Sequence, residues 1–403
     1  MSIRMKESGL PWIGEIPEHW GLTRIETLFS EGLQKNIFYE FDHALKFTYG
    51  NLVPKNEEGD VSELKGTYLA YSIIDENDIA INGLNLNFDF VSQRVARCPQ
   101  RGILTSAYLI LKPNDVRYSR YYTYQFKSWD NQKVFHGMGK GVRLTLSFSE
   151  VEKMLMPIPP LSEQQDIADF LDKKIGEIEN AIKEANELID KYKSYKQSII
   201  TEAVTKGIQP DIPMKDSGVE WIGDVPNHWK VCAFKREITI YNGKDYKDFM
   251  DDEIYPVIGS GGCFTYCSKY MYDGEALLMG RKGTIDKPLY INGKFWAVDT
   301  MFYAIPKKNL NCKFAYYLAL TFPYNLYSTS TTLPSMTQTD LGNNPVAIPP
   351  FTEQQAIVDY LDEKCTKIDS IIESKNNLIK QLQEYKKSII FEYVTGKKEV
   401  PNG

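Results

Sequence analysis

The chain has 403 residues, of which 42% are hydrophobic and 25% are charged, and its formal net charge is −6. This length allows two or more packed domains, and the overall acidity argues against nucleic-acid binding through bulk charge. Because no run of about 18 apolar residues occurs and the first residues lack a signal-peptide apolar region, we expect a cytoplasmic protein without a membrane span. Six scattered cysteines, with no Cys/His set at zinc spacing, predict free thiols rather than a metal site.

An internal repeat organises the chain. The stretch MKESGLPWIGEIPEHW at residues 5–20 returns as MKDSGVEWIGDVPNHW at residues 214–229, with ten of sixteen positions identical. A second pair, IPPLSEQQDIADFLDKK from Ile158 and IPPFTEQQAIVDYLDEK from Ile348, is offset by 190 residues rather than 209. The repeat is far longer than a solenoid period. The pattern predicts a tandem duplication, in which constant segments frame two regions of unlike sequence and unequal length, 21–156 and 230–347.

The first variable region begins acidic and ends basic. Residues 91–143 contain 10 Lys and Arg against 2 Asp and Glu, and residues 278–313 in the second region contain 7 against 2. Phosphate binding needs such local cations rather than a basic average, so both stretches are predicted to contact DNA. The predicted DNA-binding residues are Arg94, Arg97, Arg101, Lys133, Lys140, Arg143, Arg281, Lys282, Lys287 and Lys294. An ordinary surface with patchy charge remains the simpler interpretation of the same residues.

Short strands are predicted within both variable regions. The segments GTYLAYSII (66–74), LTSAYLILK (104–112), EALLMG (275–280) and MFYAIP (301–306) are rich in strand-forming residues and are bounded by turn residues. Each variable region is therefore expected to be a mixed α/β domain.

A long helix is predicted after each Pro-Pro pair. Ser162 with Gln165, and Thr352 with Gln355, match the capping-box pattern. Apolar residues then recur every 3.5 positions over more than four heptads, which predicts a coiled coil of helices roughly 60 Å long. Because duplicated units tend to close about a pseudo-two-fold axis, we predict that the two helices pair antiparallel.

The remaining motifs do not assemble into a catalytic site. The glycine-rich pieces HGMGKGVR (136–143) and GSGGCF (259–264) match neither a P-loop nor a Rossmann turn, and are interpreted as loops whose amides are available to phosphates. NNPV at 343–346 lacks the aromatic residue with which an amino-methyltransferase motif stacks a base. His19 and His228 have no paired Cys or Asp and are interpreted as structural.

The whole arrangement resembles the specificity subunit of a Type I restriction–modification enzyme. The resemblance rests on WIG-x-[IV]-P-x-HW and PP-x-[ST]-EQQ, each present twice, and it covers essentially the whole chain. It implies an α+β fold in which two mixed α/β target recognition domains are separated by a long antiparallel two-helix coiled coil, with an internal pseudo-two-fold repeat. The implied segments are target recognition domain 1 (1–157), the first helix (158–207), target recognition domain 2 (208–347), and the second helix with the C-terminal tail (348–403).

The resemblance also implies a function and partners. Each domain is expected to read one half of a bipartite double-stranded DNA site, while the helices space the domains and dock two modification subunits. Restriction subunits complete the expected complex. No catalytic residue and no cofactor is expected in this chain, because S-adenosylmethionine, ATP and Mg²⁺ belong to the other subunits. The residues implied in modification-subunit docking are Pro160, Glu163, Gln164, Gln165, Pro350, Glu353, Gln354 and Gln355.

Two alternatives remain open at the level of sequence. A stand-alone DNA-modifying enzyme would need a methyl-donor pocket or a metal-binding carboxylate cluster, and no motif indicates either one. A coiled-coil scaffold without nucleic acid would leave unexplained the basic stretch 91–143, in which aromatic residues are interleaved with the cations.

Overall fold

The protein is described by a computed structural model that covers residues 4–48, 50–55, 61–86, 93–138, 145–250, 252–327 and 334–401. The chain divides into two compact units: unit 1 is Met1–Glu184 with Asn377–Gly403, and unit 2 is Ala185–Asn376. This grouping cuts across the four predicted segments, because each long helix is shared between the units. In the described part of the chain, no helix is both long and apolar enough to cross a membrane.

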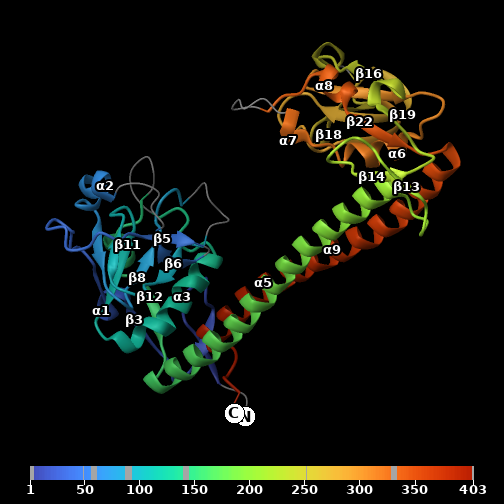
Figure 1. Ribbon diagram of the computed structural model, residues 1–403. Helices are drawn as coiled ribbons and strands as arrows, with labels where there is room; N and C mark the ends of the chain where they lie inside the picture. Colours follow the sequence, from blue (N-terminus) through green and yellow to red (C-terminus); the bar gives the residue numbers. More distant parts are fainter. Residues whose placement is uncertain are drawn as a thin grey trace. The chain divides into compact units, whose positions relative to one another are not determined.

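Unit 1 is built around a four-stranded antiparallel sheet with the strand order β4-β11-β8-β9 (Figure 1). Its core contains Trp20, Tyr121, Trp129 and Leu171, each at most 2% exposed. The elements are β1 (Met5–Glu7), β2 (Glu15–Pro17), β3 (Gly21–Arg24), α1 (Ile25–Leu28), β4 (Phe29–Glu31), β5 (Leu45–Thr48), β6 (Asn51–Pro54), α2 (Val61–Tyr68), β7 (Ser72–Ile74), β8 (Ile79–Ile81), β9 (Val95–Arg97), β10 (Gly102–Leu104), β11 (Leu109–Pro113), η1 (Val116–Tyr118), α3 (Ser119–Asn131), α4 (Phe148–Val151) and β12 (Leu155–Ile158).

Unit 2 contains a six-stranded sheet with the strand order β16-β21-β19-β20-β17-β18. Helix α6 packs on β19, β20 and β21, and also contributes to the core around Trp229 and Leu361. The elements are β13 (Met214–Asp216), β14 (Asp224–Pro226), β15 (Lys230–Ala233), η2 (Phe234–Arg236), β16 (Ile238–Asn242), η3 (Lys247–Phe249), β17 (Tyr255–Gly259), β18 (Gly262–Cys267), β19 (Tyr272–Gly280), β20 (Leu289–Ala297), β21 (Met301–Pro306), α6 (Cys312–Ala319), α7 (Tyr324–Tyr327), α8 (Gln338–Asn343) and β22 (Pro345–Ile348).

The two sheets share one topology although their sequences are unlike. The order β4-β11-β8-β9 of unit 1 corresponds to β16-β21-β19-β20 of unit 2, and every neighbouring pair in both sets is antiparallel. Unit 2 extends this sheet with the β17–β18 hairpin, in which β17 runs parallel to β20. The duplication therefore includes the variable regions, where the strand order persists and the side chains differ.

Each variable region is closed at its base by a matching pair of strands. In unit 1, β3 pairs antiparallel with β12, and in unit 2, β15 pairs antiparallel with β22. A short capped helix precedes the second strand of each pair. Ser147 with Glu150 caps α4, and Thr337 with Asp340 caps α8, at the same 190-residue offset as the constant helices. The chain thus enters and leaves each variable region at adjacent points.

One end of each sheet gathers three connections, and we call it the loop end. In unit 2, Gly280 pairs with Met301 and Asn242 pairs with Phe302, so the connection after β19, the turn before β21 and the connection after β16 meet there. In unit 1, the corresponding connections follow β8, precede β11 and follow β4. The connection that follows β4 in unit 1 exposes three large apolar side chains: Leu33 (69%), Ile37 (61%) and Phe38 (80%).

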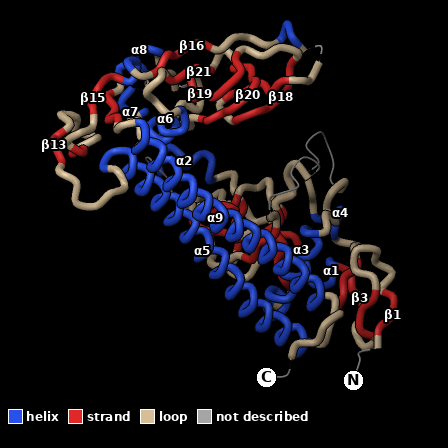
Figure 2. The backbone as a smooth tube through the Cα atoms, turned by 90° about the vertical axis from the view of Figure 1, so that its right-hand side faces the viewer, coloured by secondary structure: helices blue, strands red, loops and turns tan. Residues whose placement is uncertain are grey.

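The constant segments form two long helices, α5 (Leu161–Lys206, 46 residues) and α9 (Phe351–Val394, 44 residues). Figure 2 shows them running side by side. In unit 1, the rings of Phe170 and Tyr393 lie 4.4 Å apart, so the start of α5 packs on the end of α9. In unit 2, Lys196 near the end of α5 forms an ion pair with Asp369 in the first half of α9. The predicted antiparallel pairing is therefore confirmed within each unit.

The sequence patterns locate the elements but misplace some ends. MFYAIP coincides with β21 and EALLMG lies within β19, whereas GTYLAYSII holds the last residues of α2 before the three-residue strand β7. The capping-box prediction is wrong, because Ser162 and Thr352 lie inside the first turns of α5 and α9, which begin at Leu161 and Phe351.

Candidate nucleic-acid interface and helix junctions

A glutamate on the first turn of each long helix is bound by the hairpin that opens the repeat. In unit 1, β1 pairs with β2, and the chain then delivers Trp20 to the core. The indole Nε1 of Trp20 donates to Glu163 at 2.8 Å, and the Nε2 of His19 lies 2.8 Å from the same carboxylate. The constant WIG…HW motif thus serves to fasten the hairpin to α5.

Unit 2 repeats this junction with its own residues. Trp229 donates from Nε1 to Glu353 at 3.0 Å, and the Nε2 of His228 lies 2.8 Å from that carboxylate. The side chain of Glu353 is 14% exposed, whereas that of Glu163 is 39% exposed. The interpretation of both histidines as structural agrees with these contacts, and the junction of unit 2 is the better shielded from water.

The glutamine that follows each glutamate closes the same junction. Gln164 is buried and donates to the carbonyl of Pro159 at 2.9 Å. Gln354 is also buried, donates to the carbonyls of Pro349 and Asn309, and accepts from the backbone N–H of Asn311. Their burial corrects the expectation that these two glutamines touch another subunit, because both side chains lie inside the chain and donate to its own carbonyls.

The other predicted docking residues lie at the surface. Pro160, Gln165, Pro350 and Gln355 are exposed, at equivalent positions in the two units. Gln355 exchanges hydrogen bonds with Asn311 and Asp359. Docking through these four residues remains a prediction, while Glu163 and Glu353 are engaged by their own hairpins.

A second junction, which the sequence patterns did not indicate, ties one helix of each variable region to a long helix. In unit 1, Tyr124 of α3 donates to Asp172 of α5 at 2.6 Å, and Arg120 binds the same carboxylate through Nε at 3.0 Å. In unit 2, Tyr317 of α6 donates to Asp362 of α9 at 2.6 Å, and Lys313 forms an ion pair with it.

The two junctions follow one pattern. In each junction, a basic residue and a tyrosine stand four positions apart on the helix of the variable region. Their partner on the long helix is an aspartate, and the two aspartates, Asp172 and Asp362, are 190 residues apart. Burial, and then the hydrogen bond to the aspartate, raise the pKa of both tyrosines, so the phenols stay protonated and donate. A search for R/K-x-x-x-Y ahead of each constant segment would have found the pair in the sequence.

Two ion pairs join the long helices and repeat the same symmetry. Lys386 of α9 contacts Glu179 of α5 at 2.6 Å in unit 1, and Lys196 of α5 contacts Asp369 of α9 at 2.6 Å in unit 2. Because Lys196 and Lys386 stand in the apolar stripe, these pairs interrupt it at one equivalent level in each unit. Charges placed in this way favour one register of an antiparallel pair over others.

Removing the carboxylate of Glu353 is expected to destabilise unit 2. Glu353→Ala leaves Trp229 without its acceptor, and hydrogen bonds to charged groups are worth about 1.5–3 kcal/mol. Glu163→Ala should cost less, because Glu163 is more exposed. Denaturant unfolding followed by tryptophan fluorescence measures both losses. Glu384→Ala is the control, since Glu384 is 71% exposed and pairs with Lys387 at the surface. Equal losses for Glu353→Ala and Glu384→Ala would contradict this role for the junction.

Arg94 is the predicted DNA contact that the structure corrects. It is fully buried, and its guanidinium donates to the carbonyls of Asn82 and Leu84 at 2.9 and 2.6 Å. Its backbone N–H donates to the carboxylate of Asp130. Arg94 therefore holds the connection after β8 from inside the unit and is not presented to a DNA backbone.

Of the other predicted cations of unit 1, two lie apart from its loop end, one follows α3, and two fall outside the described residues. Arg97 of β9 is the strand partner of Ile79, which begins β8 at the end of the sheet opposite the loop end. Its guanidinium donates to the side chain of Asn77. Arg101 is bound to Asp75 at 2.7 Å. Lys133, half-buried with φ +62°, follows α3, while Lys140 and Arg143 fall outside the described residues. DNA contact by these five residues remains a prediction.

Most of the predicted cations of unit 2 gather at its loop end. Arg281, Lys282 and Lys287 all belong to the connection between β19 and β20. The backbone N–H groups of Arg281 and Lys282 donate to Thr300 at 2.8 and 3.3 Å. Lys294 lies instead on β20, above the rings of Tyr270 and Tyr255 at 4.9 and 5.6 Å. The loop end of unit 2 thus combines three cations with a short turn between two strands.

Comparisons with known proteins agree on one family. The family model of the Type I restriction modification DNA specificity domain matches residues 105–188 and 230–384. The Type I restriction enzyme MjaVIII specificity subunit of Methanocaldococcus jannaschii is 24% identical, over 96% of this chain and 95% of that protein.

Two solved structures share the fold. One, from work on complex assembly and conformational transition of the type I R-M system, has a TM-score of 0.72 at 16% identity and covers 95% of this chain and 99% of its own. The HsdS subunit from Thermoanaerobacter tengcongensis has a TM-score of 0.52 at 15% identity and covers 97% of this chain and 100% of its own.

Proposed function

The chain belongs to the Type I restriction modification DNA specificity family, and from this premise we propose that each of its units reads one half of a bipartite double-stranded DNA site. Membership makes it a DNA sequence-recognition subunit of a Type I restriction–modification system. The observation that carries the proposal is the repeated sheet β4-β11-β8-β9 and β16-β21-β19-β20, whose connections differ. One scaffold presented twice, with different loops, supports two readers of different sequences.

The loop end is the surface that we assign to DNA in each unit. In unit 2 it carries Arg281, Lys282 and Lys287, and such local cations supply the sequence-independent part of DNA affinity. In unit 1 the connection after β4, which begins at the equivalent end, exposes Phe38 and its apolar neighbours, which are suited to contact bases or sugars. Phosphate contacts then position each unit, and the loops between them read base edges.

The constant helices form the frame to which two modification subunits dock. The same surface occurs once in each unit, and this suits the binding of two copies of one partner. Its exposed residues are Pro160 and Gln165 in unit 1, and Pro350 and Gln355 in unit 2. Restriction subunits join the same complex. We assign S-adenosylmethionine, ATP and Mg²⁺ to these partners and no catalytic step to this chain.

The test of this function is reconstitution with the modification subunits. Methylation of plasmid DNA at defined sequences should appear only when this chain is added, and the isolated chain should neither bind S-adenosylmethionine nor methylate DNA. Activity of the isolated chain would favour a stand-alone modifying enzyme. A methylation pattern that is the same with and without the chain would favour a scaffold that does not read DNA.

The cations at the loop end of unit 2 should govern the salt dependence of binding. Replacing Arg281, Lys282 and Lys287 by Ala is expected to lower the slope of log K against log salt by about one unit for each residue that contacts phosphate. The measurement is a salt titration of DNA binding by the assembled complex. Lys308→Ala is the control, because this exposed lysine follows the opposite end of β21. An unchanged slope in the folded triple variant would remove this loop from the interface.

A further inference from the structure

We propose that a cavity at the loop end of unit 2 receives the edge of one base pair, and that Asp299 reads the exocyclic amino group of a cytosine or an adenine there. The inference rests on the proposed function and deepens it, because it names one specificity-determining residue and the chemical group that this residue recognises. Nothing in the family signature motifs points to Asp299, which lies within the second variable region.

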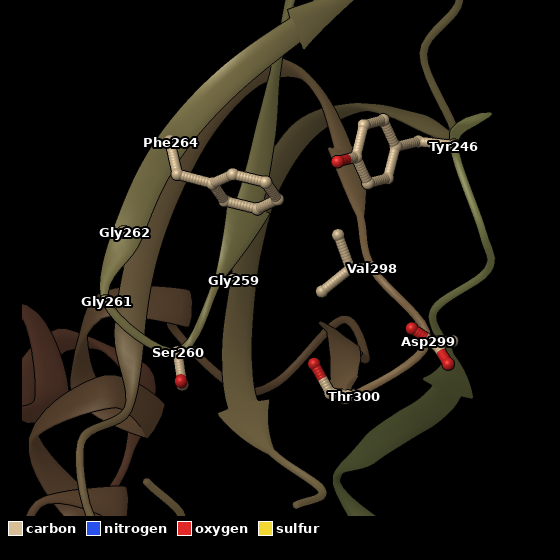
Figure 3. Close-up of a pocket in the computed structure, with 9 residues that line it drawn as sticks. All are labelled: Tyr246, Gly259, Ser260, Gly261, Gly262, Phe264, Val298, Asp299 and Thr300. Atoms are coloured by element: carbon tan, nitrogen blue, oxygen red, sulfur yellow. The ribbon is translucent and has the colours of Figure 1, made fainter. Parts of the chain in front are cut away.

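The cavity has a volume of about 430 Å³ and lies between two turns. One turn joins β17 to β18 at Ser260, and the other joins β20 to β21 at Val298, Asp299 and Thr300. Figure 3 shows the ring of Phe264 and that of Tyr246 on one side of the space, with Asp299 and Thr300 on another. The walls therefore combine two aromatic rings, two hydroxyl-bearing residues and one carboxylate.

The aromatic wall is open to a ligand. The rings of Tyr246 and Phe264 meet edge to face, with centroids 5.7 Å apart and an interplanar angle of 82°. Phe264 is 56% exposed, so one face of its ring is not used by the core. Exposed rings of this kind make apolar contact with base edges and thymine methyl groups.

The carboxylate of Asp299 is available for recognition. Asp299 is exposed, and its side chain makes no hydrogen bond or ion pair with any residue in the described ranges of the chain. An ionised carboxylate only accepts hydrogen bonds, so it selects a donor from the ligand. In the major groove the base donors are the amino groups of cytosine and adenine, and acidic side chains characteristically accept from cytosine N4.

The cations beside the cavity offset the repulsion between Asp299 and DNA. Thr300, next in sequence, accepts backbone hydrogen bonds from Arg281 and Lys282, so their loop adjoins the turn that carries Asp299. The guanidinium of Arg281 also reaches the backbone carbonyl of Asp299 at 3.4 Å. In this arrangement the two cations beside Asp299 hold phosphates, and the carboxylate accepts a hydrogen bond from a base.

The cavity is held in shape by contacts around its rim. Trp296 donates from Nε1 to the carbonyl of Lys244 at 2.8 Å, which fixes the connection that carries Tyr246. Gly243 is required at the base of that connection, because a Cβ there would collide with the backbone oxygen of Val298. The space is thus built before any ligand arrives, as preorganised recognition requires.

The experiment is selection from a duplex library by the complex assembled with its modification subunits, with both half-sites randomised. Asp299→Asn and Asp299→Ala should each lower the preference for cytosine or adenine at one position by roughly tenfold and leave the other half-site unchanged. Phe264→Ala should weaken the preference at the same or the adjacent position. Asp273→Asn is the matched control, since Asp273 is an exposed acid at the far end of β19 and should alter nothing.

The outcomes separate this inference from the function on which it rests. If the wild-type complex selects two half-sites but folded Asp299 variants keep every base preference within twofold, the cavity assignment is overturned and the proposed function stands. If the wild-type complex selects no half-site, the proposed function fails before any variant is compared, and the cavity assignment fails with it. An equal change for Asp273→Asn would show a general effect of charge and would also overturn the assignment.

Discussion

Replacing residues 21–156 by the corresponding region of another Type I specificity subunit is expected to convert one half-site completely and to leave the other half-site intact. The physical reason is the closed base of the variable region. Gly21 pairs with Ile158, so the chain leaves and re-enters the constant frame at neighbouring points. A graft across this base changes the loops that read bases and retains the host helices that position them.

The grafted region must also supply the side chains that bind Asp172 of α5. Arg120 and Tyr124 lie within the exchanged region, whereas Asp172 lies in the host helix. A donor with a basic residue and a tyrosine at these positions should give a stable chimera. Methylation-site mapping of the reconstituted chimera measures the result, and the same graft carrying Tyr124→Phe tests the fastening. A change in both half-sites, or a contiguous site, would contradict two independent readers.

Lengthening both long helices by one heptad is expected to lengthen the gap between the half-sites by about three base pairs. A heptad keeps the apolar stripe in phase and adds about 10 Å to each helix, while duplex DNA rises about 3.4 Å per base pair. The insertions belong after Ala185 and after Lys375, where the chain passes between the two compact units. Both are needed, because one alone would mismatch the antiparallel pair and its ion pairs.

The lengthened protein should bind its new site more weakly than the parent binds its own. Three base pairs turn the far half-site by roughly 100° on a 10.5-base-pair helical turn, and DNA twisting or bending must absorb the difference. Selection from a library with variable spacer length gives the result. Insertion of a heptad in α5 alone is the control and should reduce stability. A folded double insertion that still prefers the parent spacing would show that the helices dock partners without setting the distance.

The helical frame was predictable from sequence because its physics is local and periodic. Leu171 and Leu361 fall on a 3.5-residue stripe that only a packed helix pair can bury, and both are fully buried. The duplication then favours an antiparallel pair, which the contacts within each unit confirm. The helix starts were less predictable, because α5 and α9 begin one residue before the predicted caps, and Gln164 and Gln354 donate to carbonyls ahead of the helix instead of completing a capping box.

The DNA-facing residues were less accessible to sequence analysis. A basic block shows how many cations a segment holds, but not on which side of a sheet they lie. Arg94 and Arg97 are three residues apart, yet Arg94 is buried and donates to a backbone carbonyl, whereas Arg97 is exposed at the end of the sheet opposite the loop end. Asp299 and Phe264 come together through strand pairing between residues distant in the chain, and no spacing motif encodes that.

The most direct test of the account is selection by the wild-type complex, assembled with its modification subunits, from a duplex library randomised over about 20 base pairs. Two readers on one frame predict two short specified blocks separated by a fixed number of unspecified base pairs. The block read by unit 2 should contain the cytosine or adenine assigned to Asp299. Enrichment of a single contiguous sequence, or of none, would contradict the assignment of one half-site to each unit.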